Sequence, residues 1–417
     1  MDQLILNSAV NANLQNTINT SLILNHVRQL GSTYRSEISK ALNLSLPAVS
    51  RAVDQLIESG YLIERKIITD RGRQAHEVEI NAQLGISVGI SIELPMMKIA
   101  RMDMAGNILH VEEIVLDTEG KHIEQLVMEQ LEYFLKQKQV IDDQEIPVVA
   151  ITIAVPAAID LDHGEVHAVL YRNMKELNIK QMFEKTFTVP VFLENNENLA
   201  AIAEKHYGDG IPENDFIYMT IHHGIGAGCF LNGRLYRGFN GAAGEIGYQH
   251  LGSNWFSGVK ERSTFESIAA VHQIQRIALN LIHGGQGEEI FQAANYSYEQ
   301  ITHRLIGDLA VQGNEVARSI LDEFSKLLSV GVGNVLVTIN PELVIFGGQL
   351  LDIPGCNRFI IEPMKTHLAE LIPFPLPTFR LTRLGREAAV IGACQMGLER
   401  TILRHFPYSI TGGGRDT

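Results

Sequence analysis

Residues 194–198, Glu-Asn-Asn-Glu-Asn, place two carboxylates and three carboxamides directly after the apolar run of residues 189–193. A carboxylate at such a place could act as a general base, whereas a carboxamide could hold a ligand by hydrogen bonds or cap a helix. Polar groups that follow a buried strand are where α/β proteins place binding and catalytic groups. The segment is therefore the first candidate site, and the next helix is expected to begin near Leu199.

The length and composition indicate a soluble protein of two or three domains. A chain of 417 residues is too long for one hydrophobic core, and its 45% hydrophobic and 20% charged residues are ordinary for a globular protein. We find no apolar run near the roughly 18 residues of a membrane span and no secretory signal in the first 20 residues, so we expect a cytoplasmic protein without membrane insertion. The cysteines, Cys229, Cys356 and Cys394, form no CxxC pair, which argues against disulfides and a cysteine zinc site.

The charge is unevenly distributed along the chain. Residues 1–80 contain eight Lys and Arg and eight Asp and Glu, so the rest of the chain carries the whole net charge of −14. A neutral leader on an acidic body indicates two modules with different partners.

The leader has the pattern of a winged helix-turn-helix. Three helices are expected at 19–30, 35–42 and 46–60, with Ser32 or Thr33 available to cap the second, followed by a hairpin that turns at Asp70–Gly72. The third helix would enter the major groove of DNA and present Ser45, Ala48, Ser50 and Arg51. Arg65, Lys66, Arg71 and Arg73 lie in or beside the wing, within reach of phosphates or a minor groove. The alternative is a small helical module that binds protein.

From residue 85 the pattern changes to α/β. Strands are expected at 84–92, 97–104, 107–116 and 148–155, with a helix at 122–139, and a second strand–turn–strand series occupies 215–238. Helices at 264–283, 297–311 and 314–337, a strand at 342–348 and a last helix near 386–406 follow. The repeated pattern predicts two α/β lobes facing a cleft, as in the sugar kinase/actin-like ATPase (ribonuclease H-like) fold. We expect domains at 1–80, at 81–195 completed by 386–417, and at 196–385.

Five ordered motifs resemble the ROK family, whose name joins repressors, open reading frames and kinases. They are LENNEN (193–198), GIGAG (224–228), NGRLYRG (232–238), GAAGEIG (241–247) and NPELVIFGGQL (340–350). With the winged helix, the resemblance covers nearly the whole chain. It is the family's repressors that carry such a DNA-binding module, whereas its kinases lack it.

The resemblance also implies which chemistry this chain has lost. Active members bind phosphate through an Asp-x-Gly-Gly-Thr-Lys segment, where this chain has Ser91, Glu93 and Pro95 in SIELPMMK (91–98), and His222-His223 replaces a usual Gly-Thr pair. The catalytic aspartate of the kinases aligns with Asn196, whose amide cannot accept a proton near neutral pH. We therefore expect no enzyme activity and no cofactor.

Comparison with the zinc-binding motif of the family also implies that this chain lacks the zinc ligands. Tyr248 stands where the zinc-binding histidine is usual, and residues 253–266 contain no cysteine, so no metal is expected. A sugar could still contact Asn195, Asn196, Glu245, Tyr248 and Glu266. Against this, Ala157 replaces a usual glycine and the Tyr248 ring fills space; in the alternative, these polar groups only cap helices and bond within the core.

The sequence thus predicts a transcriptional repressor of carbohydrate-related genes. It would bind operator DNA as a homodimer or dimer of dimers. A small ligand, such as a sugar or a sugar derivative, would bind in the interlobe cleft and change lobe closure. Two alternatives stay open: a sugar kinase with a regulatory DNA-binding head, and a regulator controlled by a protein partner such as a phosphotransferase-system component.

Overall fold

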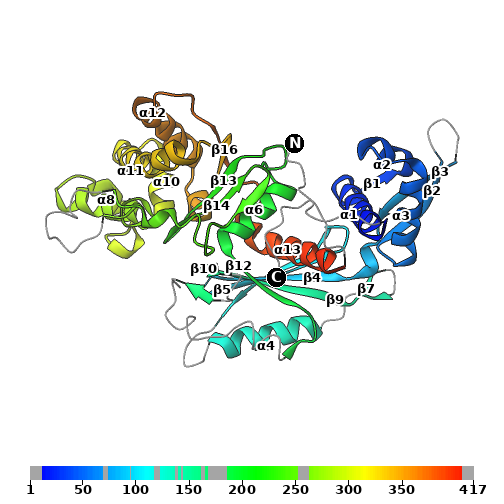
Figure 1. Ribbon diagram of the computed structural model, residues 1–417. Coiled ribbons are helices and arrows are strands. Elements are labelled where there is room, and N and C mark those ends of the chain that lie inside the picture. The colour runs from blue at the N-terminus through cyan, green and yellow to red at the C-terminus, as the bar shows by residue number, and fades with distance from the viewer. Residues whose placement is uncertain are drawn as a thin grey trace. The chain divides into compact units, whose positions relative to one another are not determined.

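The computed structural model describes residues 12–68, 74–93, 95–116, 123–136, 140–141, 144–160, 165–167, 186–251 and 263–405. The chain forms two compact units (Figure 1). Unit 1 comprises residues 1–156, 171–194 and 390–417, and unit 2 comprises residues 157–170 and 195–389. Among the described helices, none has both the length and the hydrophobicity that a membrane span requires.

The leader folds as the predicted winged helix. Helices α1 (Ala12–Leu30), α2 (Arg35–Ala41) and α3 (Leu46–Glu58) are followed by strands β2 (Leu62–Ile68) and β3 (Gln74–Ile80). A third strand that the sequence did not indicate, β1 (Ser32–Tyr34), pairs antiparallel with β3, so the sheet order is β1-β3-β2. The core joins Ile23, Leu24 and Val27 of α1 to Val49, Val53 and Leu56 of α3, all fully buried or nearly so.

The expected cap of α2 is wrong. Neither Ser32 nor Thr33 caps this helix, because both belong to β1 and the cap position is Tyr34, which makes no side-chain cap hydrogen bond. The Ser32 hydroxyl instead donates to Glu77 across the sheet (2.8 Å), and the Thr33 hydroxyl donates to the Glu37 carboxylate (3.0 Å). All three residues form β1, but only the Ser32 side chain bonds across the sheet, whereas that of Thr33 contacts the first turn of α2.

The sheet of unit 1 has the order β12-β9-β4-β5-β6. Its strands are β4 (Ile86–Glu93), β5 (Met96–Asp103), β6 (Ile108–Val115), β9 (Val148–Val155) and β12 (Val191–Asn195). Helices α4 (Ile123–Lys136) and α13 (Ala388–His405) belong with it, and small hairpins are formed by β7 (Val140–Ile141) with β8 (Gln144–Glu145) and, in unit 2, by β10 (Ala158–Asp160) with β11 (Glu165–His167). The expected strands at 84–92, 97–104, 107–116 and 148–155 are all present; the first three pair antiparallel, and β9 pairs parallel with β4.

Unit 2 holds a second five-stranded sheet, of order β15-β14-β13-β16-β17. Its strands are β13 (Phe216–Ile221), β14 (Ile225–Leu231), β15 (Arg234–Tyr236), β16 (Leu343–Gly347) and β17 (Thr378–Leu381). The helices are α6 (Asn196–Tyr207), α7 (Phe265–Ala269), α8 (His272–His283), α9 (Glu288–Ala293), α10 (His303–Gln312), α11 (Glu315–Ile339) and α12 (Glu362–Leu371). The expected single helix at 264–283 is wrong, because the chain is extended at Ala270 and divides it into α7 and α8.

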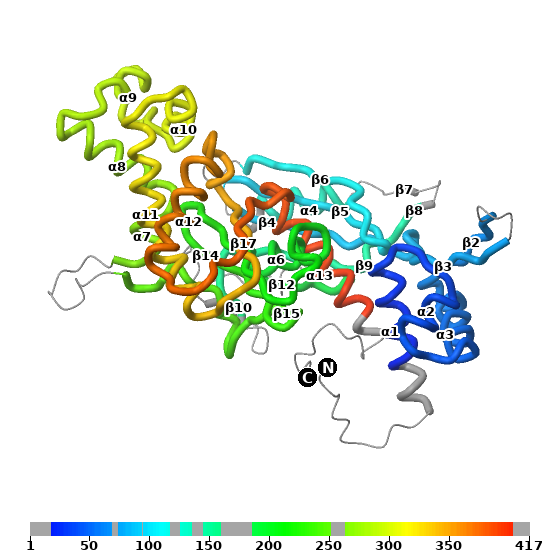
Figure 2. Tube along the Cα trace, turned by 90° about the horizontal axis from the view of Figure 1, so that it is seen from above, coloured from blue at the N-terminus to red at the C-terminus, as the bar shows by residue number. Residues whose placement is uncertain are grey.

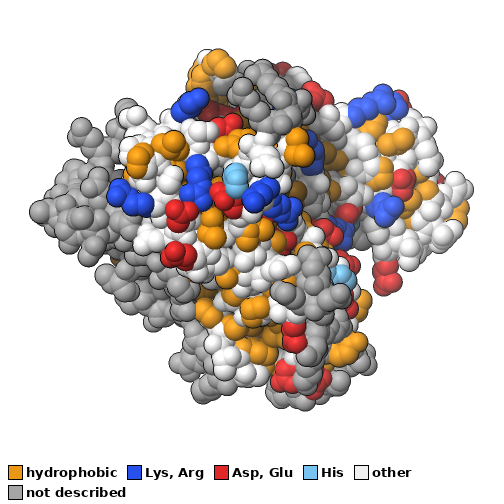
Figure 3. All heavy atoms as spheres, turned by 90° about the vertical axis from the view of Figure 1, so that its right-hand side faces the viewer, with side chains coloured by type: hydrophobic (Ala, Val, Ile, Leu, Met, Phe, Trp, Pro, Cys, Tyr) orange, Lys and Arg blue, Asp and Glu red, His pale blue; other side chains and the backbone are white. Residues whose placement is uncertain are grey.

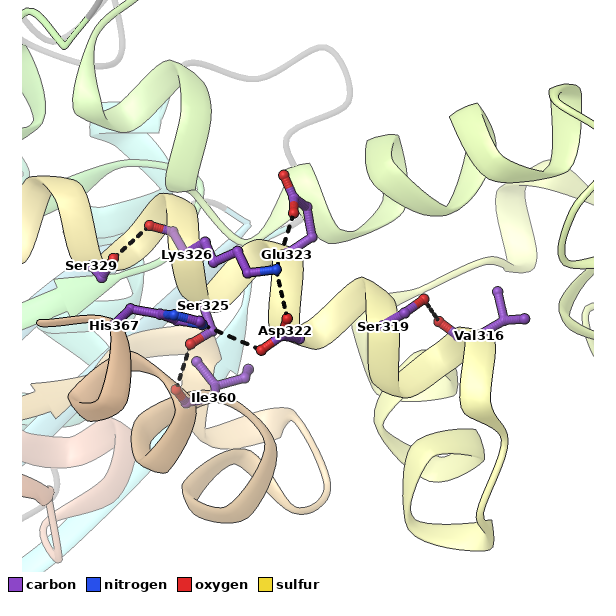
Figure 4. A network of polar contacts seen from close by, with 9 residues as sticks. All are labelled: Val316, Ser319, Asp322, Glu323, Ser325, Lys326, Ser329, Ile360 and His367. Atoms are coloured by element: carbon purple, nitrogen blue, oxygen red, sulfur yellow. Dashed lines mark hydrogen bonds and ion pairs between the residues drawn. The ribbon is translucent and has the colours of Figure 1, made fainter. Parts of the chain in front are cut away.

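The long helix α11 is fixed to its neighbours by polar contacts (Figure 4). The buried Ser325 hydroxyl donates to the carbonyl oxygen of Ile360 (3.0 Å). Asp322 Oδ1 lies 3.3 Å from Nε2 of His367 on α12, and its other oxygen lies 2.8 Å from Lys326 Nζ. The ammonium of Lys326 holds the pKa of Asp322 below its usual value. These polar contacts fix the orientation of α11 against its neighbours, which otherwise pack through apolar side chains.

Candidate DNA-binding and ligand-binding sites

The recognition helix α3 is built to expose its amino-terminal end. Ser45 is the cap, and its hydroxyl accepts from the amide of Ala48 (3.4 Å), while Pro47 occupies the first turn, where its missing N–H costs no hydrogen bond. Ser45 and Arg51 are exposed, whereas Ala48 and Ser50 are half-buried. The four residues that were predicted to contact DNA from this helix therefore lie on or beside its accessible part.

Arg35 positions this helix. Its guanidinium donates to the Ser50 carbonyl oxygen (3.3 Å), lies 2.8 Å from an Asp54 oxygen and donates to Glu64 on β2 (3.0 Å). One side chain thus joins α2, α3 and the wing. Charge-assisted contacts of this kind fix geometry more than they add stability at a surface.

In the wing, Arg65 pairs with Glu79 and is two-thirds exposed, and Lys66 lies opposite His76. Arg71 and Arg73 fall outside the described residues. The view from the winged-helix side of Figure 1 shows basic side chains mainly in the upper half of that face, with acidic side chains between them (Figure 3). One residue that the sequence did not single out is Leu46, which begins α3 and is 49% exposed. An apolar side chain at this place could contact a thymine methyl group.

Neighbouring residues of the polar segment at 194–198 have different structural roles. Helix α6 begins at Asn196 and not near Leu199, because the Asn195 side chain accepts hydrogen bonds from the amides of Glu197 (2.9 Å) and Asn198 (3.0 Å). Asn195 Nδ2 also donates to the Ala157 carbonyl oxygen (3.2 Å). Asn195 therefore acts as a helix cap, and these hydrogen bonds to backbone groups give it a structural role.

Asn196 is in a different situation. It is 7% exposed, and within the described part of the chain its Oδ1 is buried with no hydrogen-bond partner. A buried acceptor without a donor costs free energy, so a native protein that retains one has a reason to do so. A ligand hydroxyl would satisfy it. The amide cannot act as the base that the kinases of this fold use, as the sequence indicates.

The glycines of GIGAG have a packing role. A side chain at Gly226 would meet the Glu197 side chain at 3.0 Å, and one at Gly228 would meet the Glu197 carbonyl oxygen at 2.2 Å. The two glycines thus allow α6 to lie directly on β14. This close approach explains them without a bound phosphate.

The AGEIG loop brings the predicted ligand-contacting carboxylates together. Gly244 has a φ of +91°, and a side chain there would collide with the Ala227 carbonyl oxygen, so only glycine fits this contact with β14. Burial, and then the nearby charge of Glu266, raise the pKa of Glu245. The Glu266 carboxylate accepts from the Ile225 amide (3.2 Å), and the pKa of Tyr248 is raised by burial and by both glutamates. Glu245, Tyr248 and Glu266 therefore form one acidic group of side chains, with Tyr248 59% exposed.

A histidine group lies at the end of β13 and was only partly noticed in the sequence. The rings of His222 and His223 meet edge to face with centroids 4.8 Å apart, and the Val271 amide at the start of α8 donates to the His222 carbonyl oxygen (3.0 Å). Burial, followed by the neighbouring His223 and Arg386, lowers the pKa of His222 to about 4. Burial also lowers the pKa values of His272 and His303, each of which has His223 among its charged neighbours. The adjacent pair at 222–223 was the available signal.

The first phosphate segment of the family is a closed hairpin in this chain. Ser91 is paired with Lys98, Glu93 is paired with Met96, and the Pro95 carbonyl oxygen accepts from the Leu116 amide (2.7 Å). A phosphate cradle needs successive amides that point at the ligand. Here strand pairing continues to the last residues of β4, which leaves no such loop among the described residues.

Metal binding has no described ligand set. No group of three or more His, Cys, Asp or Glu side chains in the described ranges is arranged to hold a metal ion. Residues 252–262, which include Trp255, lie outside the described residues. The three cysteines are buried, and burial raises their pKa values to about 11 for Cys229 and about 12 for Cys356 and Cys394.

The family model described as "ROK family" matches residues 87–400. The chain belongs to the ROK family. A second model, "Winged helix-turn-helix DNA-binding", matches residues 18–63. The chain is 28% identical to the xylose repressor of Caldicellulosiruptor bescii over 347 residues, 81% of this chain and 85% of that protein. It is 23% identical to the N-acetylglucosamine repressor of Escherichia coli O157:H7, over 86% of this chain and 89% of the other.

Solved structures show the same fold. A ROK family transcriptional regulator, a homologue of the E. coli MLC protein, superposes with a TM-score of 0.77 at 21% identity and covers 94% of this chain and 98% of its own. A ROK family glucokinase from Streptomyces griseus gives 0.63 at 20% identity, covering 76% of this chain and all of its own. The larger overlap with the regulator includes the winged helix, and both likenesses confirm the predicted fold class.

Proposed function

We propose that this ROK-family chain is a transcriptional repressor of carbohydrate-related genes. It binds operator DNA through α3 and the wing, and a small ligand held in unit 2 changes its affinity for the operator. The observation that carries the DNA-binding function is the complete winged helix with Ser45 and Arg51 exposed at the start of α3. The names of the relatives, xylose repressor and N-acetylglucosamine repressor, support the carbohydrate class.

Operator recognition requires two copies of the chain. Each winged helix reads one half-site, and a pseudo-palindromic operator mirrors a two-fold symmetric dimer. The acidic body supplies the dimer contact. The mass of the purified chain by light scattering, free and with operator, is expected to correspond to two copies or a multiple of two.

The ligand site is proposed to consist of Asn195, Asn196, Glu245, Tyr248 and Glu266. Carboxylates accept and amides both donate and accept hydrogen bonds, so the group suits a polyhydroxylated ligand. The buried, unpartnered Oδ1 of Asn196 is the strongest support, because a ligand hydroxyl would satisfy it. Thermal-shift measurements with xylose, glucose and N-acetylglucosamine test the site; stabilisation by none of them, nor by their derivatives, counts against it.

We propose further that the chain has no sugar kinase activity. Asn196 removes the base, which contributes roughly 10²- to 10⁴-fold to such reactions, and the hairpin at Glu93–Met96 replaces the phosphate loop. A coupled ATP assay with the same sugars is expected to show no turnover. Turnover that depends on the sugar would overturn this part and favour a kinase with a DNA-binding head.

Selection of operator sequences with the purified full-length chain tests the main proposal. Wild type is expected to enrich a pseudo-palindromic sequence, and Arg51→Ala and Arg71→Ala are expected to weaken its binding. Glu58→Ala, at the exposed far end of α3, is the matched control that should bind normally. If wild type enriches no sequence, the repressor assignment fails.

A further inference from the structure

Helix α13 connects the two units along the chain. Its first two residues, Ala388 and Ala389, belong to unit 2, and from Val390 onward it belongs to unit 1. There it lies close against the sheet, because a side chain at Gly89 of β4 would collide with the Val390 carbonyl oxygen and the Cys394 amide. The Cys394 thiol also donates to the Ala100 carbonyl oxygen (3.4 Å). The helix thus packs closely within unit 1 and begins where unit 2 ends in the chain.

The last turns of α13 contact the DNA-binding module. Arg28 of α1 donates through both terminal nitrogens to Glu399 Oε1, at 3.3 and 3.5 Å, and Gln395 Nε2 donates to the same oxygen at 2.9 Å. Figures 1 and 2 both show α1 beside the carboxyl-terminal end of α13. We call Arg28, Gln395 and Glu399 the α1–α13 contact.

The α1–α13 contact is polar and well shielded from solvent. The Arg28 side chain is 8% exposed and that of Glu399 is 18% exposed. A shielded ion pair is strongly attractive when made, and costly to the partner left behind when one member is removed. Removal of one partner is therefore expected to be costly, whereas separation of both groups into water restores their hydration.

Helix α1 also contains polar atoms that the fold does not satisfy, and one of them belongs to the α1–α13 contact. Asn25 Nδ2, His26 Nε2 and Arg28 Nε are buried, and each is without a hydrogen-bond partner among the described residues. The apolar side of the helix, by contrast, is fully packed through Ile23, Leu24 and Val27. The unpaired Nε of Arg28 lowers the stability of the closed contact relative to a solvated one, because a buried donor without an acceptor costs free energy. The two arrangements are thereby brought closer in free energy, which is what a switch requires.

We propose that the α1–α13 contact is the element through which unit 2 controls the DNA-binding module. When the contact is made, the winged helix is held in one orientation on unit 1, and the heads of a dimer are preorganised for the two half-sites. Ligand binding in unit 2 weakens the contact through α13, so the heads lose their fixed orientation and operator affinity falls. The inference rests on the proposed repressor function, and adds to it the residues that transmit the signal.

Operator titrations test the role of the contact. Arg28→Gln and Glu399→Gln are each expected to weaken operator binding about tenfold and to reduce the further effect of ligand. The charge exchange Arg28→Glu with Glu399→Arg is expected to restore most of the affinity. Gln29→Ala, an exposed neighbour on α1, is the matched control and should behave as wild type.

A distance measurement separates a lost contact from a misfolded module. Because the native cysteines are buried, spin labels can be attached selectively at two exposed positions: Ser59→Cys in the winged helix and Val115→Cys on β6. A narrow distance distribution is expected in wild type and a broad one in Arg28→Gln, with a narrow one again in the charge exchange. An unchanged distribution in Arg28→Gln, or unchanged operator affinity in both single variants, overturns the inference. Failure of wild type to bind any operator would instead overturn the proposed repressor function.

Discussion

Asn195 and Asn196 are adjacent in the chain but serve opposite purposes. The Asn195 carboxamide is the cap of α6 and bonds to three backbone groups, whereas Asn196 Oδ1 is buried with no partner in the described part of the molecule. A cap stabilises the fold, whereas a buried acceptor without a donor costs free energy that a hydrogen bond from a ligand would recover. Asn195 therefore has a structural role, whereas a ligand-binding role is proposed for Asn196.

Asn195→Ala is expected to destabilise unit 2 by about 1 kcal/mol, because both capped amides of α6 lose their acceptor. Asn195→Asp keeps an acceptor oxygen at the cap and is the matched control, with a smaller expected loss. Chemical denaturation followed by circular dichroism measures both. Equal stability of Asn195→Ala and wild type would show that the cap contributes little.

Asn196→Ala is expected to lower the affinity for a stabilising sugar about tenfold, since one hydrogen bond to a buried acceptor is lost. The fold should be unharmed or slightly more stable, because the unsatisfied oxygen is removed. Calorimetric titration and the melting temperature give the two quantities. An unchanged affinity would place the sugar elsewhere.

Asn196→Asp is expected to give no kinase turnover even though it restores a carboxylate at the position of the base. The reason is that the hairpin at Glu93–Met96 still replaces the phosphate loop. A coupled ATP assay with the sugar panel measures this. Turnover in this variant, beside none in wild type, would show that loss of the base alone silenced the enzyme.

Arg51→Ala is expected to weaken operator binding at least tenfold, because an exposed cation near the start of α3 is removed from the DNA interface. If Arg51 binds a phosphate, the slope of log affinity against log salt becomes shallower by about 1 and sequence preference is kept. If it reads a base, preference at one position relaxes. Binding titrations at several salt concentrations on matched and mismatched operators separate these results.

The buried His222 is expected to make unit 2 sensitive to acid. Its pKa falls from the ordinary 6.5 to about 4, so the neutral ring stabilises the fold above pH 6.5 and this contribution is lost as the pH falls from 6.5 towards 4. The charged groups around it are His223, His303, Arg386 and Asp352. His222→Asn should therefore flatten the fall in stability over that range.

The comparison must be made as the difference between His222→Asn and wild type. The raised pKa values of Glu204 and Glu245 act in the opposite direction, because protonation of a buried carboxyl stabilises the fold as the pH falls. Denaturant unfolding at pH 5, 6 and 7.5 gives the difference. A difference that does not change with pH would contradict the inferred burial of the ring.

Local sequence patterns predicted most elements. The apolar spacing of α3, the three strands β4 to β6 joined by tight turns and the continuous apolar run of β9 all fold as expected. What failed was local structure that depends on distant partners: Ser32 and Thr33 pair with β3 through a strand too short to show a period, and the helix expected at 264–283 breaks at Ala270.

The sequence by itself determined which side-chain chemistry is available. The amide at position 196, and Ser91, Glu93 and Pro95 in the segment that resembles the family's phosphate loop, follow from residue types, because side-chain chemistry does not depend on the fold. Only the tertiary structure decided what each group does. It showed that Asn195 caps helix α6, and that Gly226 and Gly228 allow α6 to pack closely on β14. It also placed Arg28 against Glu399, 371 positions away. Such contacts depend on how strands and helices pack across the whole chain, and no local periodicity encodes them.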